Sequence, residues 1–380
     1  MEGLVRQATP PSRTLAVRAV LAAAADAGLK PEDIDGLMVC RSGGASESDL
    51  GLNVQRAAML TNLKLLEVVY AEGASSIAII QTAAMAVSMG LATTVACVFA
   101  DAPMTPGVST SAAFGQRKTV KGVEGLRFAA GLFGGAGIYA LAARRYMARY
   151  GATSEHLGAV AISARKWAQM NPRAIFQTPL TMEDYLASRW IADPFRLYDC
   201  AIPVNGSIAV IVTTVDRARD LARPPVHVLG MGQGHPGALD QHGFERELGG
   251  AAALAKQAAF AMADVSVKDI DVCAFYDAFT YSTLATLEDY GFCGRGEAKD
   301  FVASGAIAPG GSLPVNTGGG HLSGYYLQGM TPVSEAVLQA RGEAGERQCA
   351  KHDLVLATNE GGRFDHHACL ILSPHARATA

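Results

Sequence analysis

The chain has 380 residues, of which 49% are hydrophobic and 18% charged, so it can bury a large core and is long enough for about two domains. Its net charge of −3 and its lack of basic runs argue against a nucleic-acid or polyanion partner. Seven scattered cysteines without a CxxC pair indicate reduced thiols and predict no metal site in the chain itself. No apolar run is long enough to span a bilayer, so we expect a cytoplasmic protein with no membrane contact.

Helix and strand patterns alternate through the first half of the chain. An alanine-rich helix is predicted over residues 12–28, where Gly28 ends it. Strands are predicted at 36–40, 65–70, 93–100 and 207–213, and further helices at 76–89, 135–150 and 154–170. Gly, Ser, Thr, Pro and Lys dominate residues 102–132, which we interpret as an inserted loop region able to cover a site.

The second half repeats this plan after a linker at 219–225. In both halves a helix is followed by the tripeptide Asp-Ile-Asp and then by a buried strand. The tripeptide is centred on Ile34 in the first half and on Ile270, 236 positions later, in the second. The glycine-rich loop GGGHLSGYY at 318–326, with the helix after it, likewise mirrors Gly73 and its helix. Two such echoes in the same order predict a duplicated α/β unit, with halves at 1–217 and 224–380 and the ligand site between them.

Four stretches are candidates for that site. They are GASS at 73–76, YDAF at 276–279, the glycine-rich loop, and NEGG at 359–362. Each follows a buried strand or opens a helix, which is where α/β folds place their ligand-binding groups. We therefore expect these stretches to converge and to supply the substrate-binding residues, namely Gly73, Asp277, Gly320, His321 and Gly361.

The order of the four stretches resembles the thiolase superfamily, and specifically its lipid-transfer-protein or sterol-carrier-x-like branch. Segments such as PLTMEDYL at 179–186 and IADP at 191–194 are similar to that branch, and the resemblance covers almost the whole chain. It implies a thiolase fold, an α/β architecture of two pseudo-symmetric βαβαβαββ halves with layered sheets and helices. The strand that precedes the first helix in that family is expected to be missing or cut short here.

The chain departs from thiolases at each of their catalytic positions. The thiolase nucleophilic Cys falls on Gly73, and the second Cys falls near Thr358 or Asn359. Thiolases have Asn-Glu-Ala-Phe where this chain has YDAF, and Gly-His-Pro where it has Tyr-Tyr-Leu at 325–327. Without these groups, Claisen chemistry through an acyl-enzyme is not supported.

Two tyrosines stand in their place and resemble the pair in the steroid side-chain-cleaving aldolases of this superfamily. That resemblance implies that Tyr276 and Tyr326 are the acid/base pair for retro-aldol cleavage of a β-hydroxyacyl-CoA into a short acyl-CoA and a ketone or aldehyde. It implies no cofactor in the chain itself and a small partner with a zinc ribbon and an OB-fold, which would hold the only zinc. A homodimeric core flanked by two such partners, a heterotetramer, is the expected assembly.

Retro-aldol chemistry needs a base for the β-hydroxyl and a group that holds the thioester enolate, but no sulfur nucleophile. Because a phenol with a pKa near ~10 is a poor base, we expect the dipole of the helix after the loop to lower the pKa of Tyr326. The vacated position at Gly73 should offer backbone N–H groups to the thioester oxyanion and room for a branched substrate carbon. Which tyrosine is the base stays open, as does whether His321 binds, assists a proton transfer or shapes the loop.

Two other functions stay open on the sequence. A degradative thiolase would need a hidden nucleophile close to Gly73, and Cys40 and Cys369 are the candidates. A non-catalytic lipid-binding scaffold would have Tyr276 and Tyr326 pointing apart or into the core.

Overall fold

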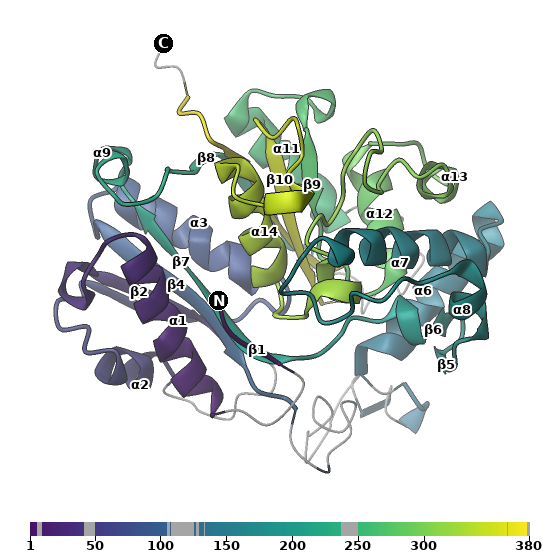
Figure 1. Cartoon of the computed structure of the whole chain (residues 1–380), viewed down its shortest axis with the longest axis horizontal. Coiled ribbons are helices and arrows are strands. Elements are labelled where there is room, and N and C mark those ends of the chain that lie inside the picture. Colours follow the sequence, from purple (N-terminus) through teal and green to yellow (C-terminus); the bar gives the residue numbers. More distant parts are fainter. Residues whose placement is uncertain are drawn as a thin grey trace.

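The computed structural model describes residues 1–5, 10–41, 50–104, 107, 125–126, 129–132, 134–236, 250–362 and 364–377. This part of the chain forms two main β-sheets, with helices between them and outside them (Figure 1). Of the predicted insertion at 102–132, only 102–104, 107, 125–126 and 129–132 belong to the described residues. Within these ranges, no helix combines the length and apolar character that crossing a bilayer requires.

The first sheet takes all its strands from the first half and has the order β1-β7-β4-β2-β3. Its members are β1 (Glu2–Val5), β2 (Gly36–Cys40), β3 (Leu65–Val69), β4 (Thr94–Asp101) and β7 (Asn205–Thr213). Strand β2 runs parallel to β3 and β4, whereas β7 is antiparallel to β4 and β1. The strand before the first helix is therefore present, but it has only four residues.

The second sheet has the order β8-β11-β10-β9. It contains β8 (His227–Gly234), β9 (Val272–Ala274), β10 (Val355–Gly361) and β11 (His366–Ser373). Strand β10 is parallel to β9 and antiparallel to β11, and β11 is antiparallel to β8. These pairings reproduce those of β1, β7, β4 and β2 in the same spatial order, which is the duplicated unit that the sequence echoes predict.

Two helices separate the sheets. Helices α3 (Ser75–Ser88) and α14 (Met330–Arg341) each contact strands of both sheets and also contact each other. Helix α3 is apolar on nearly every side, as a helix enclosed between two layers requires. The outer layers are α1 (Ser12–Asp26) and α2 (Leu50–Ala57) on the first sheet, and α11 (Gly250–Ala263) and α12 (Thr280–Tyr290) on the second.

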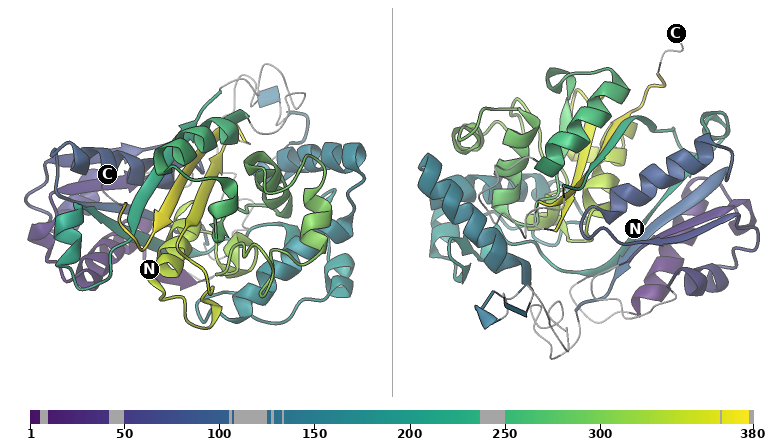
Figure 2. Two further views of the ribbon diagram at one scale, coloured as in Figure 1. Left: turned by 90° about the horizontal axis from the view of Figure 1, so that it is seen from above. Right: turned by 180° about the vertical axis from the view of Figure 1, so that it is seen from behind.

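The long connection between β4 and β7 packs on the other half of the molecule. It contains α6 (Gly134–Tyr150), α7 (Ser154–Gln169), α8 (Met182–Ala187) and the short pair β5 (Trp190–Ala192) and β6 (Phe195–Arg196). Helix α7 contacts α12 and α13 (Ala298–Ala303), so these helices lie at the opposite end from the first sheet (Figure 2). The short helix α9 (Val215–Arg219) then leads to the second half.

Candidate active site

The glycine-rich loop closes tightly over the end of β9. It contains a π-helical turn, Gly320–Gly324, directly before Tyr325. Gly320 has a φ of +56°, and a Cβ atom there would lie only 2.1 Å from Oδ2 of Asp277, so this position requires glycine. The far end of the loop is fixed by the N–H of Tyr326, which donates to the carbonyl of Ile202 at 2.9 Å.

The loop brings two phenols together. The hydroxyl oxygens of Tyr276, just after β9, and Tyr326 are 2.7 Å apart, and the two rings meet edge to face. Tyr276 is 5% exposed, while Tyr326 is half-buried. The scaffold hypothesis required these side chains to point apart or into the core. Their hydrogen bond contradicts the first arrangement, whereas Tyr276 does lie in the core.

The expectation that Tyr326 has a lowered pKa is wrong. Burial raises the pKa of Tyr326 to about 12, because a phenolate inside the protein loses its hydration, and the hydrogen bond with Tyr276 offsets only part of this cost. The nearby carboxylates of Asp101 and Glu72 raise the pKa further. Burial likewise raises the pKa of Tyr276 well above its ordinary value. Desolvation thus outweighs the helix dipole, and neither phenol is ionised at neutral pH.

His321 is fully buried behind the two tyrosines. Its Nε2 lies 2.8 Å from the carbonyl of Gln328, which only accepts hydrogen bonds, so the proton of the ring is on Nε2. Its Nδ1 faces Oδ1 of Asp277 at 3.3 Å, and its backbone N–H donates to the same oxygen at 2.8 Å. Burial lowers the pKa of His321 to about 3 and raises that of Asp277 to about 7. Both side chains thus hold the loop in place, and substrate binding by either stays a prediction.

Gly73 is close to the phenols but does not leave open space. A Cβ atom at Gly73 would lie 1.8 Å from the carbonyl oxygen of Glu360 and 2.8 Å from Cζ of Tyr276. Gly361 is equally confined, because its Cβ would lie 2.6 Å from the backbone nitrogen of Gly73. The idea that glycine makes room for a branched substrate carbon is therefore wrong at this atom, since strand β10 occupies that volume.

Much of the N-terminus of α3 is also occupied. The N–H groups of Ala74 and Ser75 donate to the carbonyls of Ala71 and Glu72. When the Asn359 side-chain amide is oriented so that both its oxygen and its nitrogen make hydrogen bonds, its oxygen accepts from the N–H of Ile77 at 3.1 Å. Fewer backbone donors than expected are thus available to an oxyanion at this end of α3.

Sequence reasoning did not single out two buried residues of this region, Glu360 within the candidate stretch NEGG and Tyr139. Glu360 is 1% exposed, and its Oε1 accepts a hydrogen bond from Ser282 at 2.9 Å. The ring of Tyr139, on α6, packs against Phe279 of the YDAF segment with the ring centroids 4.9 Å apart, and burial together with the charge of Glu360 raises the pKa of its phenol. Burial raises the pKa of Glu360 to about 8, and the Ser282 and Tyr139 hydroxyls oppose that rise. An acidic residue inside an apolar strand was the available signal for Glu360, whereas an aromatic residue in an alanine-rich helix gave none for Tyr139.

The two candidates for a hidden nucleophile, Cys40 and Cys369, are protonated thiols and not thiolates. Cys40 is buried, its Sγ donates to Oε1 of Gln328 at 3.1 Å, and burial raises its pKa to about 12. Cys369 is buried too, with its Sγ 3.5 Å from the carbonyl of Ala255, and its pKa is also raised to about 12. A nucleophile must be a thiolate, so neither sulfur supports thiolase chemistry.

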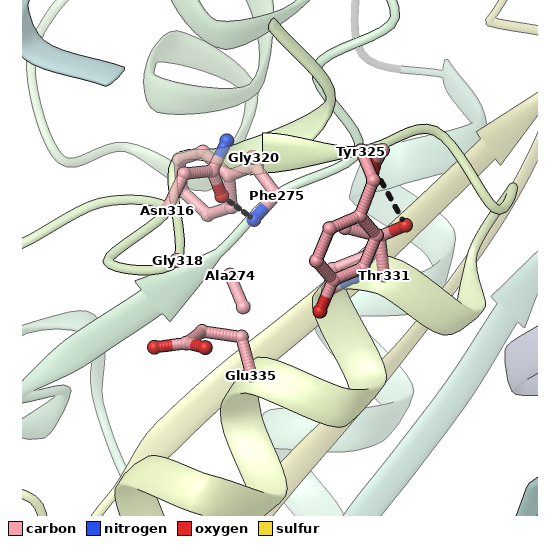
Figure 3. A pocket seen from close by; sticks show the side chains of 9 residues that line it. Ala274, Phe275, Asn316, Gly318, Gly320, Tyr325, Thr331 and Glu335 are labelled. Carbon is pink, nitrogen blue, oxygen red and sulfur yellow. Dashed lines mark hydrogen bonds between the residues drawn. The ribbon is translucent and has the colours of Figure 1, made fainter. Parts of the chain in front are cut away.

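A small cavity of about 10 Å³ lies behind the loop (Figure 3). Glu335 of α14 and Tyr325 line it, and the Asn316 side chain accepts from the N–H of Phe275 beside it at 2.6 Å. It has room for about one water molecule and not for an acyl group. No cluster of three or more His, Cys, Asp or Glu side chains that could hold a metal ion occurs among the described residues.

Known proteins resemble this chain over most of its length. The thiolase C-terminal domain-like family matches residues 246–374. A steroid side-chain-cleaving aldolase of Thermomonospora curvata is 41% identical over 339 residues, which are 86% of this chain and 85% of the relative. The 17-hydroxy-3-oxo-4-pregnene-20-carboxyl-CoA lyase of Mycobacterium tuberculosis is 40% identical over 341 residues, 86% of each chain.

Solved structures agree with these relatives. The Ltp2-ChsH2(DUF35) aldolase has a TM-score of 0.88 and 36% identity, covering 98% of this chain and 95% of the other. The Acat5 thiolase from Ascaris suum in complex with coenzyme A has a TM-score of 0.69 at 14% identity, which shows the shared fold alone.

Proposed function

Because the chain belongs to the steroid side-chain-cleaving aldolases of the thiolase superfamily, we propose that it cleaves a β-hydroxyacyl-CoA by a retro-aldol reaction. The products are a short acyl-CoA and a ketone or aldehyde. The observation that carries this proposal is the hydrogen-bonded pair Tyr276–Tyr326 beside Gly73, where a thiolase would hold its nucleophilic sulfur. The reaction uses no cofactor in this chain, and the CoA thioester is the substrate.

The two phenols divide the proton transfers between them. One tyrosine receives the proton of the β-hydroxyl as the Cα–Cβ bond breaks and passes its own phenol proton to the other tyrosine. That second tyrosine holds the thioester enolate and gives its phenol proton to Cα. Their 2.7 Å hydrogen bond supports this role, because a proton that one phenol receives can pass directly to the other. No sulfur nucleophile is required, in keeping with the un-ionised thiols of Cys40 and Cys369.

The acyl group is a steroid side chain in this proposal. The Mycobacterium tuberculosis relative is a lyase of a 17-hydroxy pregnene carboxyl-CoA, so a tertiary β-hydroxyacyl-CoA attached to a ring system is the substrate class to test. Other branched or aromatic acyl-CoA thioesters are the competing substrates.

The partner is a small protein of the DUF35 type. The Ltp2-ChsH2(DUF35) aldolase pairs such a protein with a chain that superposes on 98% of this one. The partner would carry the zinc ribbon, with the only zinc, and the OB-fold. The assembly is a cytoplasmic homodimer of this 39.6 kDa chain flanked by two partners. Light scattering on the co-purified complex tests this heterotetramer. A mass equal to one chain plus one partner would contradict it.

The function is tested with the co-expressed complex and two substrates. One sample receives a tertiary β-hydroxyacyl-CoA, and the other a β-ketoacyl-CoA with free CoA. Release of short acyl-CoA in the first sample alone is expected. Release in the second alone would show thiolase activity, and no release in either would favour a scaffold.

Tyr326→Phe is expected to lower kcat by about 10²–10⁴-fold, because it removes a positioned proton-transfer group. Tyr325→Phe is the matched control. Tyr325 is the neighbouring buried phenol, but it lines the cavity behind the loop (Figure 3). Its hydroxyl lies 3.1 Å from the sulfur of Met1. Equal loss in both variants would mean that the loop, not the Tyr326 hydroxyl, was damaged.

A further inference from the structure

The glycine-rich loop needs support from outside itself. Gly319 and Gly320 have φ values of +91° and +56°, and glycine leaves a backbone with more conformational freedom than any other residue. Tyr326 nevertheless follows the π-helical turn Gly320–Gly324 closely enough that its hydroxyl lies 2.7 Å from that of Tyr276. The position of the turn therefore decides whether the two phenols meet.

The segment after α7 supports the turn through its backbone. The N–H groups of Ile175 and Phe176 donate to the carbonyls of Gly324 and Ser323 at 2.9 and 3.1 Å. Helix α7 itself also contacts the turn. Both supports come from the first half of the chain, whereas the turn belongs to the second half.

Arg165, on α7, adds a side-chain contact to the same turn. It is 5% exposed, and its Nε–H donates to the hydroxyl of Ser323 at 2.9 Å. Its Nη1–H donates to the carbonyl of Thr178 at 2.8 Å, so one guanidinium binds both the turn and the segment beside it. Its Cζ lies 5.2 Å from the ring centroid of Phe176 and 5.5 Å from that of Tyr198. Together these contacts fix the planar group in one orientation.

Arg165 is a buried cation without an acidic partner. No carboxylate lies within ion-pair distance of it in the part of the chain that the structure describes. Burial lowers its pKa, but an arginine side chain stays charged in proteins. Because a buried charge without a counter-charge costs free energy, a side chain that only filled this space would be better apolar. What the guanidinium adds is its hydrogen bond to the turn.

We propose that Arg165 is a positioning residue of the retro-aldol site, which holds the turn through Ser323 so that the Tyr326 hydroxyl stays within reach of Tyr276. The inference rests on the proposed function and deepens it. Arg165 exchanges no proton with the substrate and acts only through the position of Tyr326.

The first test removes the hydrogen bond from either side in the co-expressed complex. Arg165→Met, which keeps an unbranched apolar side chain, should lower kcat for the tertiary β-hydroxyacyl-CoA by about 10–100-fold, because a displaced proton-transfer group loses much of its effect. KM should stay within about 3-fold, since ground-state binding is not what Arg165 provides. Ser323→Ala should also lower kcat, and adding it to Arg165→Met should cost little more, because both remove the same hydrogen bond.

The decisive measurement uses the Tyr326→Phe enzyme. In that background Arg165→Met should lower the residual kcat by less than about 2-fold, because the hydroxyl that Arg165 positions is already gone. A residue that only stabilised the fold would lower the rate of both enzymes alike.

Lys166→Met is the matched control. Lys166 is the next cation along α7, but it is exposed. Its substitution should leave kcat and KM unchanged in both backgrounds.

The inference is overturned if Arg165→Met keeps the kcat of the unmodified enzyme, or if it costs the Tyr326→Phe enzyme as much as the unmodified one. If circular dichroism shows that Arg165→Met does not fold, an unchanged kcat in Ser323→Ala overturns it instead. Failure of the proposed function looks different, because the unmodified enzyme would then release no acyl-CoA from the β-hydroxyacyl substrate.

Discussion

At the scale of single residues, Gly73 shows how far this site has moved from a thiolase. The position that holds the nucleophilic Cys in thiolases leaves no empty space here, because the Glu360 carbonyl and the Tyr276 ring occupy the volume that a side chain at Gly73 would need. A single substitution back to cysteine cannot restore a nucleophile there without pushing β10 away. Loss of thiolase chemistry thus involves the backbone as well as the missing sulfur.

Gly73→Cys is expected to lower the free energy of unfolding by about 1–3 kcal/mol, because the added atoms overlap backbone that cannot move freely. Urea unfolding followed by circular dichroism measures the loss, and assays with β-ketoacyl-CoA and CoA should show no thiolysis. Gly135→Cys is the control, since a Cβ there would make ordinary contact, 3.7 Å from Phe279. A stable, thiolytic Gly73→Cys enzyme would refute this account.

At the scale of elements, the loop that carries Tyr326 is held from behind by α14. The Glu335 carboxylate accepts from Nε of Arg347 at 2.9 Å and from the hydroxyl of Thr317 at 2.7 Å. Both charged side chains are buried. Thr317 directly precedes the first glycine of the loop, so its hydrogen bond to Glu335 ties the loop to α14, and the ion pair with Arg347 holds that carboxylate in place.

Glu335→Ala should therefore destabilise the fold by about 3–5 kcal/mol, because it leaves the buried guanidinium of Arg347 without a counter-charge. Denaturant titration gives this value, and a loosened loop should also reduce kcat. Asp216→Ala, which removes the exposed ion pair with Arg219, should change stability by less than about 1 kcal/mol. A similar small effect in both variants would show that the buried pair does not anchor the loop.

At the scale of the whole molecule, buried acids make stability depend on pH. Burial raises the pKa of Glu360 to about 8 and that of Asp277 to about 7. The folded chain therefore keeps protons that the unfolded chain has already released, and it is stabilised by them only below those pKa values. His321 and His367, whose pKa values burial lowers to about 3, act in the opposite direction but mainly below pH 6.5.

These two carboxyls together should lower the free energy of unfolding by roughly 1–2 kcal/mol as pH rises from 7 to 8.5, since each excess proton in the folded state contributes about 1.4 kcal/mol per pH unit. Urea titrations across this range measure the slope. Glu360→Gln should make the decrease in the free energy of unfolding with pH smaller, because a glutamine has no proton to lose. A stability that increases over the same range would contradict the raised pKa values.

Much of the fold could be predicted from the sequence because its signals are local. The helix expected after the glycine-rich loop is α14 (Met330–Arg341), and the strand predicted at 93–100 matches β4 (Thr94–Asp101). The duplicated Asp-Ile-Asp segments do precede corresponding strands, β2 and β9, in the two sheets. The connection after β4 was less predictable, since its helices pack on the second half and nothing local specifies that choice.

The sequence by itself indicated two similar halves, because the order and spacing of local segments repeat along the chain. Its resemblance to the thiolase superfamily implied the fold and pointed to Tyr276 and Tyr326 as the candidate pair. Only the tertiary structure decided that the phenols meet at 2.7 Å, that their pKa values rise instead of falling, and that β10 closes on Gly73. It also placed the Glu360 carbonyl against Gly73 and packed Tyr139 against Phe279. The physical reason is that desolvation and contact depend on how the layers pack: the two tyrosines lie 50 positions apart in the chain, and Gly73 lies in the other half from β10.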